Sequence, residues 1–178
     1  MNQDIRKQRI ARWSRLLSLA VLITALCLPV VSFVAVLFMS PADLAKAAHV
    51  SEALTRGAAP AALIAVAALA TVPVLIFCWG LFAVRAALAS FQRGVYFSAS
   101  VFWSIRRLAV ALFLSAALRL VVVPLSGALL SLGQDQGSIA LSVGSGEFMP
   151  IMLGAGLWLL AWIFTEAAEL EAENKQFV

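Results

Sequence analysis

The chain has 178 residues, of which 63% are hydrophobic and only 12% are charged, and its mean hydropathy is +0.99. This composition excludes an ordinary water-soluble enzyme or regulator of the same length. The formal charge of +4 does not predict nucleic-acid binding, because the basic residues cluster at the ends of apolar runs, where they contact anionic headgroups. The sequence therefore predicts an all-α membrane protein whose first partner is the lipid bilayer, with no direct nucleic-acid partner.

The N-terminal arm, residues 1–15, is basic and contains Asp4 as its single acid. The apolar run that follows, residues 16–39, has no charge and is longer than the apolar region of a cleavable signal peptide. It predicts a first transmembrane helix. Pro29 lies near its centre, where it removes a backbone donor and favours a kink.

A short segment, residues 40–57, separates the first two apolar runs. Ser40 is a good N-cap, Pro41 suits the first helical position, and Gly57 suits a helix end. The pattern predicts one short amphipathic helix along the outer surface. His49, the single histidine, lies here without cysteines or paired acids nearby, which favours a solvated loop histidine over a metal ligand.

The second predicted span covers residues 61–84, with Pro73 near its middle. A hinge, residues 85–107, follows it and contains four arginines and no acid, which predicts a cytoplasmic location. Ser98 can cap a new helix that starts around Ala99 and continues into the third span.

Arg119 is the only charged side chain inside a predicted span, here residues 108–132. At 1.5 Å per residue it lies about 18 Å beyond Arg107, near the middle of a hydrocarbon core about 30 Å thick. Leaving it without a partner costs about 2.5–3.5 kcal/mol on insertion scales. One hypothesis is that Arg119 points into the bundle and bonds the carbonyls that Pro29 and Pro73 free at this depth, together with the nearby hydroxyl groups of Thr24 and Thr71. The alternatives are binding of an anion, quinone or lipid headgroup, and direct contact with lipid.

The last third of the chain predicts an outer loop and a fourth span. Residues 133–147 are acidic and contain no lysine or arginine, and the alternation of residues 138–143 is compatible with a short strand. The fourth span, residues 148–165, carries Gly154 and Gly156, which permit close helix contact.

The distribution of basic residues predicts the orientation. Arm and hinge together hold nine lysines and arginines, whereas Lys46 and Arg56 are the basic residues of the outer segments. The acidic tail, residues 166–178, then lies inside by parity. The prediction is a four-transmembrane-helix bundle, a single integral membrane domain over residues 1–178, with both termini cytoplasmic. Assembly into a homo-oligomer is compatible with all of these features.

Several membrane functions require residues that this chain lacks. A haem b protein needs histidine pairs inside its spans, and a proton-coupled exporter needs an intramembrane carboxylate. Cys27 and Cys78 both fall inside apolar runs, where buried free thiols are the simplest interpretation. The sequence contains no catalytic, metal-ligand or cofactor-binding pattern. It favours a protein that is not an enzyme and has no cofactor.

Two signatures in the second half of the chain resemble a known family. They are RGVYFSASVFWSIRRL, with Gly94, Phe97 and Ser98, and IFTEAAELEAENKQFV, with Glu166, Leu170, Glu173, Asn174 and Val178. Over residues 85–178 the chain resembles the small bacterial inner-membrane proteins known as domain of unknown function 2975, and the resemblance implies a location in a bacterial inner membrane. Members are often encoded beside a small helix-turn-helix regulator, and the resemblance implies that the two act together.

The leading hypothesis is therefore a non-enzymatic membrane protein whose cytoplasmic hinge and tail engage a regulator or another membrane protein. The alternative is that Arg93, Arg106 and Arg107 only pair with the glutamates of the tail and with lipid. Other hypotheses are a small transporter or accessory subunit that uses Arg119 to bind an anion, quinone or lipid, and an enzyme or lipid-binding subunit with a ligand between helices. The candidate residues of the hinge and tail are Arg93, Gly94, Phe97, Ser98, Arg106, Arg107, Glu166, Glu169 and Glu173.

Overall fold

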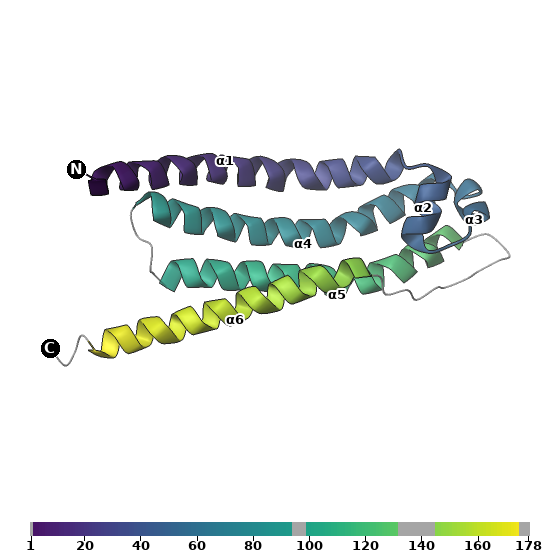
Figure 1. Cartoon of the computed structure of the whole chain (residues 1–178). Coiled ribbons are helices and arrows are strands. Elements are labelled where there is room, and N and C mark those ends of the chain that lie inside the picture. Colours follow the sequence, from purple (N-terminus) through teal and green to yellow (C-terminus); the bar gives the residue numbers. More distant parts are fainter. Residues whose placement is uncertain (1, 94–98, 132–144, 175–178) are drawn as a thin grey trace.

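The computed structural model describes residues 2–93, 99–131 and 145–174, with side chains for residues 12–93, 101–131 and 148–166. The described part of the chain forms helices joined by short loops (Figure 1). The helices are α1 (Asn2–Leu37), α2 (Pro41–Ala48), α3 (Glu52–Arg56), α4 (Pro60–Gln92), α5 (Ala99–Ser131) and α6 (Ser145–Asn174). Residues 138–143, whose alternation is compatible with a short strand, lie outside the described residues.

Four of these helices are long and apolar enough to cross a membrane, as the sequence predicts. The apolar stretches are Arg12–Leu37, Pro60–Gln92, Val101–Ser131 and Phe148–Glu166. The helices extend further than the predicted spans, because charged residues limit an apolar run but do not interrupt backbone hydrogen bonding. The basic arm is thus the beginning of α1, and α4 continues to Gln92. After the gap in the described residues, α5 is helical from Ala99 onward, the position around which the sequence predicts a helix.

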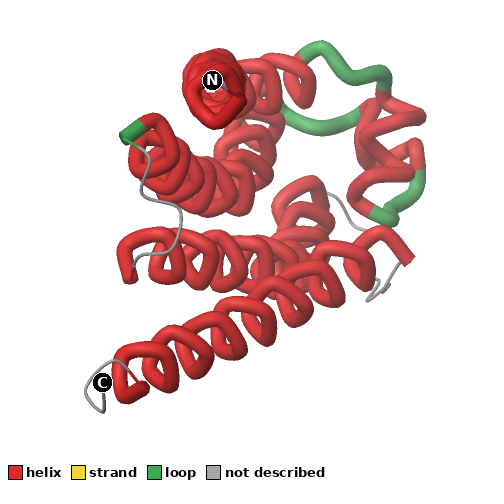
Figure 2. Tube along the Cα trace, turned by 60° about the vertical axis from the view of Figure 1, so that its left-hand side comes forward, coloured by secondary structure: helices red, strands yellow, loops and turns green. Residues whose placement is uncertain are grey.

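The long helices lie side by side in one row, in the order α1, α4, α5, α6 (Figures 1 and 2). Within the described residues, each long helix packs chiefly on its neighbour in the sequence, so the row is open rather than closed into a ring. The beginning of α1 and the end of α6 lie at one end of the molecule, while α2 and α3 lie at the other (Figure 1). The inner helices α4 and α5 are covered on two sides, and α1 and α6 expose most of their apolar surface.

Small side chains bring the inner helices close together. Ala111 of α5 is completely buried. A Cβ atom at Gly80 of α4 would lie only 2.5 Å from the Cβ atom of Ala111 on α5. Since lipid chains are as apolar as leucine side chains, helices in a membrane associate through this kind of close packing rather than through hydrophobic burial.

The segment between α1 and α4 forms two helices, where the sequence predicts one. Ser40 accepts a hydrogen bond from the Asp43 amide, and Pro41 starts α2, so the predicted start is correct. His49 adopts a left-handed conformation (φ 54°) that ends α2 after Ala48. The Thr55 hydroxyl of α3 donates to the carbonyl of Pro41 at 2.8 Å, which holds the two short helices together.

A small apolar cluster fixes α2 against the long helices. Leu44 and Ala48 of α2 pack on Val66 of α4 and Leu130 of α5, and each of these four side chains is at least 95% buried. Leu130 is the largest fully buried side chain among the described residues. This cluster places α2 across the end of the row, over the space between α1, α4 and α5.

Candidate functional site: a groove lined by Arg119

A groove of about 270 Å³ lies between α1, α4 and α5, beneath α2. It contains one charged side chain, Arg119, and two hydroxyl groups, those of Ser32 and Ser126. Among the described residues, no acidic side chain contributes to its lining. The remaining lining residues are apolar: Val36, Met39, Leu44, Ala47, Ala48, Val66, Ala70, Pro73, Val74, Val122 and Val123.

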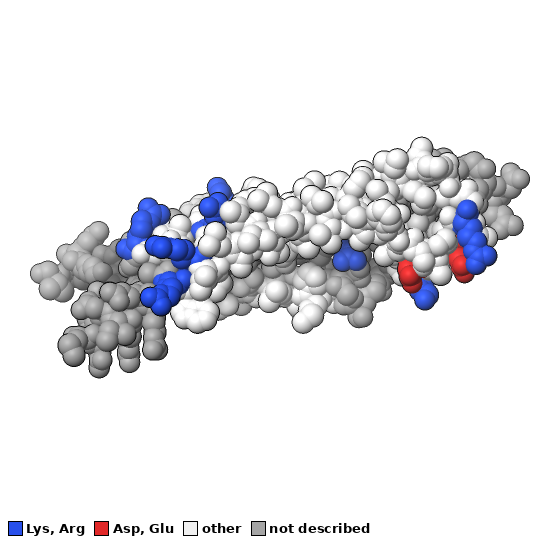
Figure 3. Space-filling view, turned by 90° about the horizontal axis from the view of Figure 1, so that it is seen from above, with Lys and Arg blue, Asp and Glu red and all other residues white. Residues whose placement is uncertain are grey.

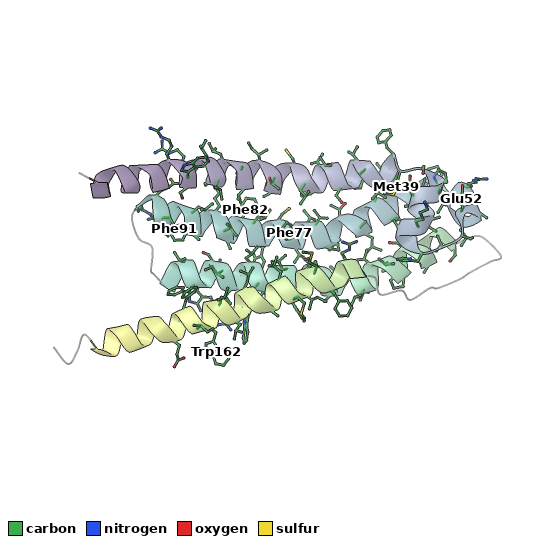
Figure 4. All side chains as sticks on the ribbon, in the orientation of Figure 1. Met39, Glu52, Phe77, Phe82, Phe91 and Trp162 are labelled. Carbon is green, nitrogen blue, oxygen red and sulfur yellow. The ribbon has the colours of Figure 1, made fainter. Side chains whose placement is uncertain are left out.

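The open row of helices creates this groove. Both α1 and α5 pack on α4, while within the described residues they make few contacts with each other. The surface of α4 is therefore the floor of the groove, α1 and α5 are its walls, and α2 closes one end. Figure 4 shows Met39, another lining residue, in the loop between the end of α1 and the start of α2. The groove exists because four helices in a row leave their inner members accessible from the side.

Pro73 gives the floor of the groove an unusual backbone. Proline has no N–H, so the carbonyl four residues earlier, that of Leu69, loses its usual helical donor. The side chain of Pro73 is buried and lines the groove together with Arg119. Figure 1 shows α4 curving along its length, as helices do at proline.

Arg119 lies at the middle of the third span. At 1.5 Å per residue it is about 18 Å along α5 from Arg107 in one direction and from Ser131 in the other. Its side chain is exposed at the protein surface while it lines the groove. A guanidinium group has five N–H donors, which is enough to hold a protein acceptor and a ligand oxygen at the same time. A molecule arriving from the side of the protein can therefore reach this cation.

The predicted surroundings of Arg119 are present only in part. Pro73 lines the groove with Arg119, but Pro29 does not. The Thr71 hydroxyl donates to the Ala67 carbonyl of its own helix at 2.7 Å. The idea that Arg119 bonds the carbonyls freed by both prolines stays a prediction.

Sequence reasoning did not find the two serines or the contribution of α2. A signal existed for Ser126, which is seven residues after Arg119 and therefore two helical turns further along the same face of α5. Ser32 and the lining residues of α2 have no such signal, because the groove depends on which helices are neighbours.

The basic residues of the predicted hinge gather at the end of the molecule that contains the beginning of α1. Figure 3 shows lysine and arginine side chains at this end, and both basic and acidic ones at the other. Arg93, Arg106 and Arg107 are exposed, and the Arg106 guanidinium lies 5.3 Å from the ring centre of Trp103. Glu166 is exposed on α6. Gly94, Phe97 and Ser98, and the side chains of Glu169 and Glu173, lie outside the described residues.

The two cysteines are free and differ in exposure. Cys78 is buried, whereas Cys27 is exposed, so the prediction of two buried thiols is wrong for Cys27. Position 27 lies on α1, which is covered on one side only. Among the described residues, histidine, cysteine and carboxylate side chains form no group of three or more that could hold a metal ion.

Fold and groove together define a multi-pass protein of four apolar helices with a cationic groove in the middle of its hydrophobic region. The chain belongs to the family described as protein of unknown function DUF2975, whose family model matches residues 45–178. This confirms the resemblance carried by the hinge and the tail. The matched region contains α3, α4, α5, α6 and part of α2, and therefore three of the four apolar helices. No curated protein and no solved structure matches the chain.

Proposed function

We propose that this protein is a non-enzymatic membrane protein that holds a small amphiphile in the groove beside Arg119, as a carrier or as an accessory subunit of a membrane complex. The observation that carries this proposal is the cavity that joins Arg119 to a continuous apolar lining. A small transporter or accessory subunit requires such a cavity. A closed apolar bundle around Arg119 would have argued against it.

The groove suits a molecule with one apolar part and one oxygen-rich part. Guanidinium groups bind oxygen acceptors through charge-assisted hydrogen bonds, which are stronger than neutral ones. The apolar walls offer packing for a hydrocarbon part, and the exposed position of Arg119 lets such a molecule enter from the lipid. Among the described lining residues, the hydroxyl groups of Ser32 and Ser126 have no histidine or carboxylate beside them that could act as a general base, so binding is the activity that the lining supports.

Native mass spectrometry of protein released from lipid nanodiscs tests this function. The unaltered protein is expected to retain a small amphiphile, and Arg119→Leu to lose at least nine-tenths of it, since a charge-assisted hydrogen bond contributes about 1.5–3 kcal/mol. Arg15→Leu is the matched control, because Arg15 is an exposed arginine on α1 that does not line the groove. Equal retention by the unaltered protein and Arg119→Leu would contradict the proposal.

We further propose that the protein lies in a bacterial inner membrane with both termini in the cytoplasm. Support comes from the nine basic residues of the arm and hinge, and from the first residues of α1 and the last of α6, which lie at the same end of the molecule (Figure 1). In a background without native cysteines, Lys46→Cys should react with a membrane-impermeant maleimide in intact cells. Arg93→Cys should react only after the cells are permeabilised, and the reverse pattern would overturn the orientation.

A second candidate function is an interaction between the basic end and a cytoplasmic regulator or another membrane protein. The exposed guanidinium groups of Arg93, Arg106 and Arg107 favour it, because they offer an acidic partner surface several donors at one end of the molecule. The labelling experiment also bears on this candidate. A cytoplasmic regulator requires that Arg93→Cys be protected in intact cells, so labelling there from outside would remove it.

A further inference from the structure

We infer that the ligand of the groove is a lipophilic monocarboxylate, an acid with a single acyl chain, whose carboxylate binds Arg119 and whose chain extends along the groove toward α2. This inference rests on the proposed function of the groove and specifies the chemical class of its ligand. Three observations carry it: the charge of the lining, the depth of Arg119, and the size of the groove.

The charge of the lining matches one negative charge. Among the described lining residues, Arg119 is the only charged side chain, and the two hydroxyl groups are neutral. A carboxylate accepts two parallel hydrogen bonds from one guanidinium, in a geometry that fits its two oxygens. A doubly charged phosphate would bring an excess negative charge into a medium of low dielectric constant, where it is strongly unfavourable. A neutral quinone would form weaker hydrogen bonds to the same group.

The depth of Arg119 argues against an ordinary phospholipid. Arg119 lies near the centre of a hydrocarbon core about 30 Å thick, so a headgroup at its normal depth remains about 15 Å away. A phosphodiester is charged at all physiological pH values and does not enter the core. A carboxylic acid enters as the neutral, protonated form, and it releases one proton to water when it binds Arg119 as the carboxylate.

The size of the groove fits one chain rather than two. Its volume of about 270 Å³ lies near the lower limit of ligand pockets, which is about 300 Å³. Along α5 the lining extends from Arg119 to Ser126, which is about 10 Å at 1.5 Å per residue. Val122 and Val123 line this stretch on α5, and Val36 of α1 and Val74 of α4 also line the groove.

The test uses the full-length protein in nanodiscs and decanoate that carries a carbon-13 label at its carboxyl carbon. Saturable binding is expected, and the bound carboxyl signal should titrate at a lower pH than in protein-free nanodiscs, because a neighbouring cation favours the ionised form. Arg119→Gln should weaken binding about 10-fold or more and abolish this shift. 1-Decanol, which has the same chain without the charge, should bind at least about 10-fold more weakly.

Two variants separate the ligand site from the general condition of the protein. Ala70→Phe fills the floor of the groove while Arg119 remains, and it should also abolish saturable decanoate binding. Arg15→Gln removes an arginine outside the groove and should leave binding unchanged. Decanoate binding that survives both Arg119→Gln and Ala70→Phe would overturn the inference.

A neutral quinone with the same chain distinguishes this inference from the proposed function. If decylubiquinone or 1-decanol binds in a manner that depends on Arg119 and decanoate does not, the groove is an amphiphile site and the monocarboxylate inference is wrong. If none of the three compounds binds in a manner that depends on Arg119, both the inference and the proposed function fail. Binding of decanoate that depends on Arg119 and Ala70 supports both.

Discussion

Replacing Gly80 by leucine is expected to lower the free energy of unfolding by about 3 kcal/mol, which is the upper part of the range for overpacking a tightly packed interface. Any side chain at this position places a Cβ atom 2.5 Å from the Cβ atom of Ala111 and 3.5 Å from the Cα atom of Leu108. Neither atom is the end of a flexible side chain, so α4 and α5 must move apart. Unfolding in a titration with sodium dodecyl sulfate, followed by tryptophan fluorescence, measures the loss.

The chain provides a matched control and a compensating change for this prediction. A Cβ atom at Gly156 on α6 would meet no heavy atom within 4 Å, so Gly156→Leu should leave stability unchanged or raise it slightly. Gly80→Ala should be destabilising by itself and should recover most of its stability when combined with Ala111→Gly, which removes the opposing Cβ atom. Equal effects of leucine at Gly80 and Gly156 would show that the close approach of α4 and α5 is not essential.

Replacing Leu130 by alanine is expected to cost about 2–5 kcal/mol, the range for removing a large side chain from a closely packed site. Leu130 is 1% exposed and packs against Leu44 and Ala48 of α2 and Val66 of α4. Its removal deprives all three helices of contact atoms, and neighbours that belong to different helices cannot all move into the space. Amide hydrogen exchange should show α2 losing protection before the long helices do.

Leu125 is the matched control, because it belongs to the same helix and is 46% exposed. Leu125→Ala should cost less than about 1 kcal/mol, since it removes contacts with lipid rather than with protein. Three residues of the Leu130 cluster, Leu44, Ala48 and Val66, also line the groove. Leu130→Ala is therefore expected to weaken ligand retention even though Leu130 does not line the groove. Unchanged retention would show that α2 does not contribute to the site.

The two ends of α2 and the end of α4 illustrate how far local sequence determines structure. Ser40 and Pro41 define the start of α2 correctly because an N-cap depends on a few consecutive residues. The sequence does not predict the end of α2 at His49, because a left-handed conformation at a residue other than glycine depends on its surroundings. The same reasoning explains where α4 ends. Hydropathy ends the predicted span before Arg85, whereas backbone hydrogen bonding continues the helix to Gln92.

The amino-acid sequence by itself determined the class of this protein: four apolar helices, a basic end, and one arginine in the middle of a span. Each of these follows from residues close together in the chain, since span length and depth are counted along a helix. Only the tertiary structure decided that the helices form an open row, that Arg119 faces a groove, and that α2 covers its end. The physical reason is that lipid and protein present equally apolar surroundings to these helices. Hydropathy therefore predicts that a face avoids water, and packing alone decides whether that face meets lipid, another helix or a ligand.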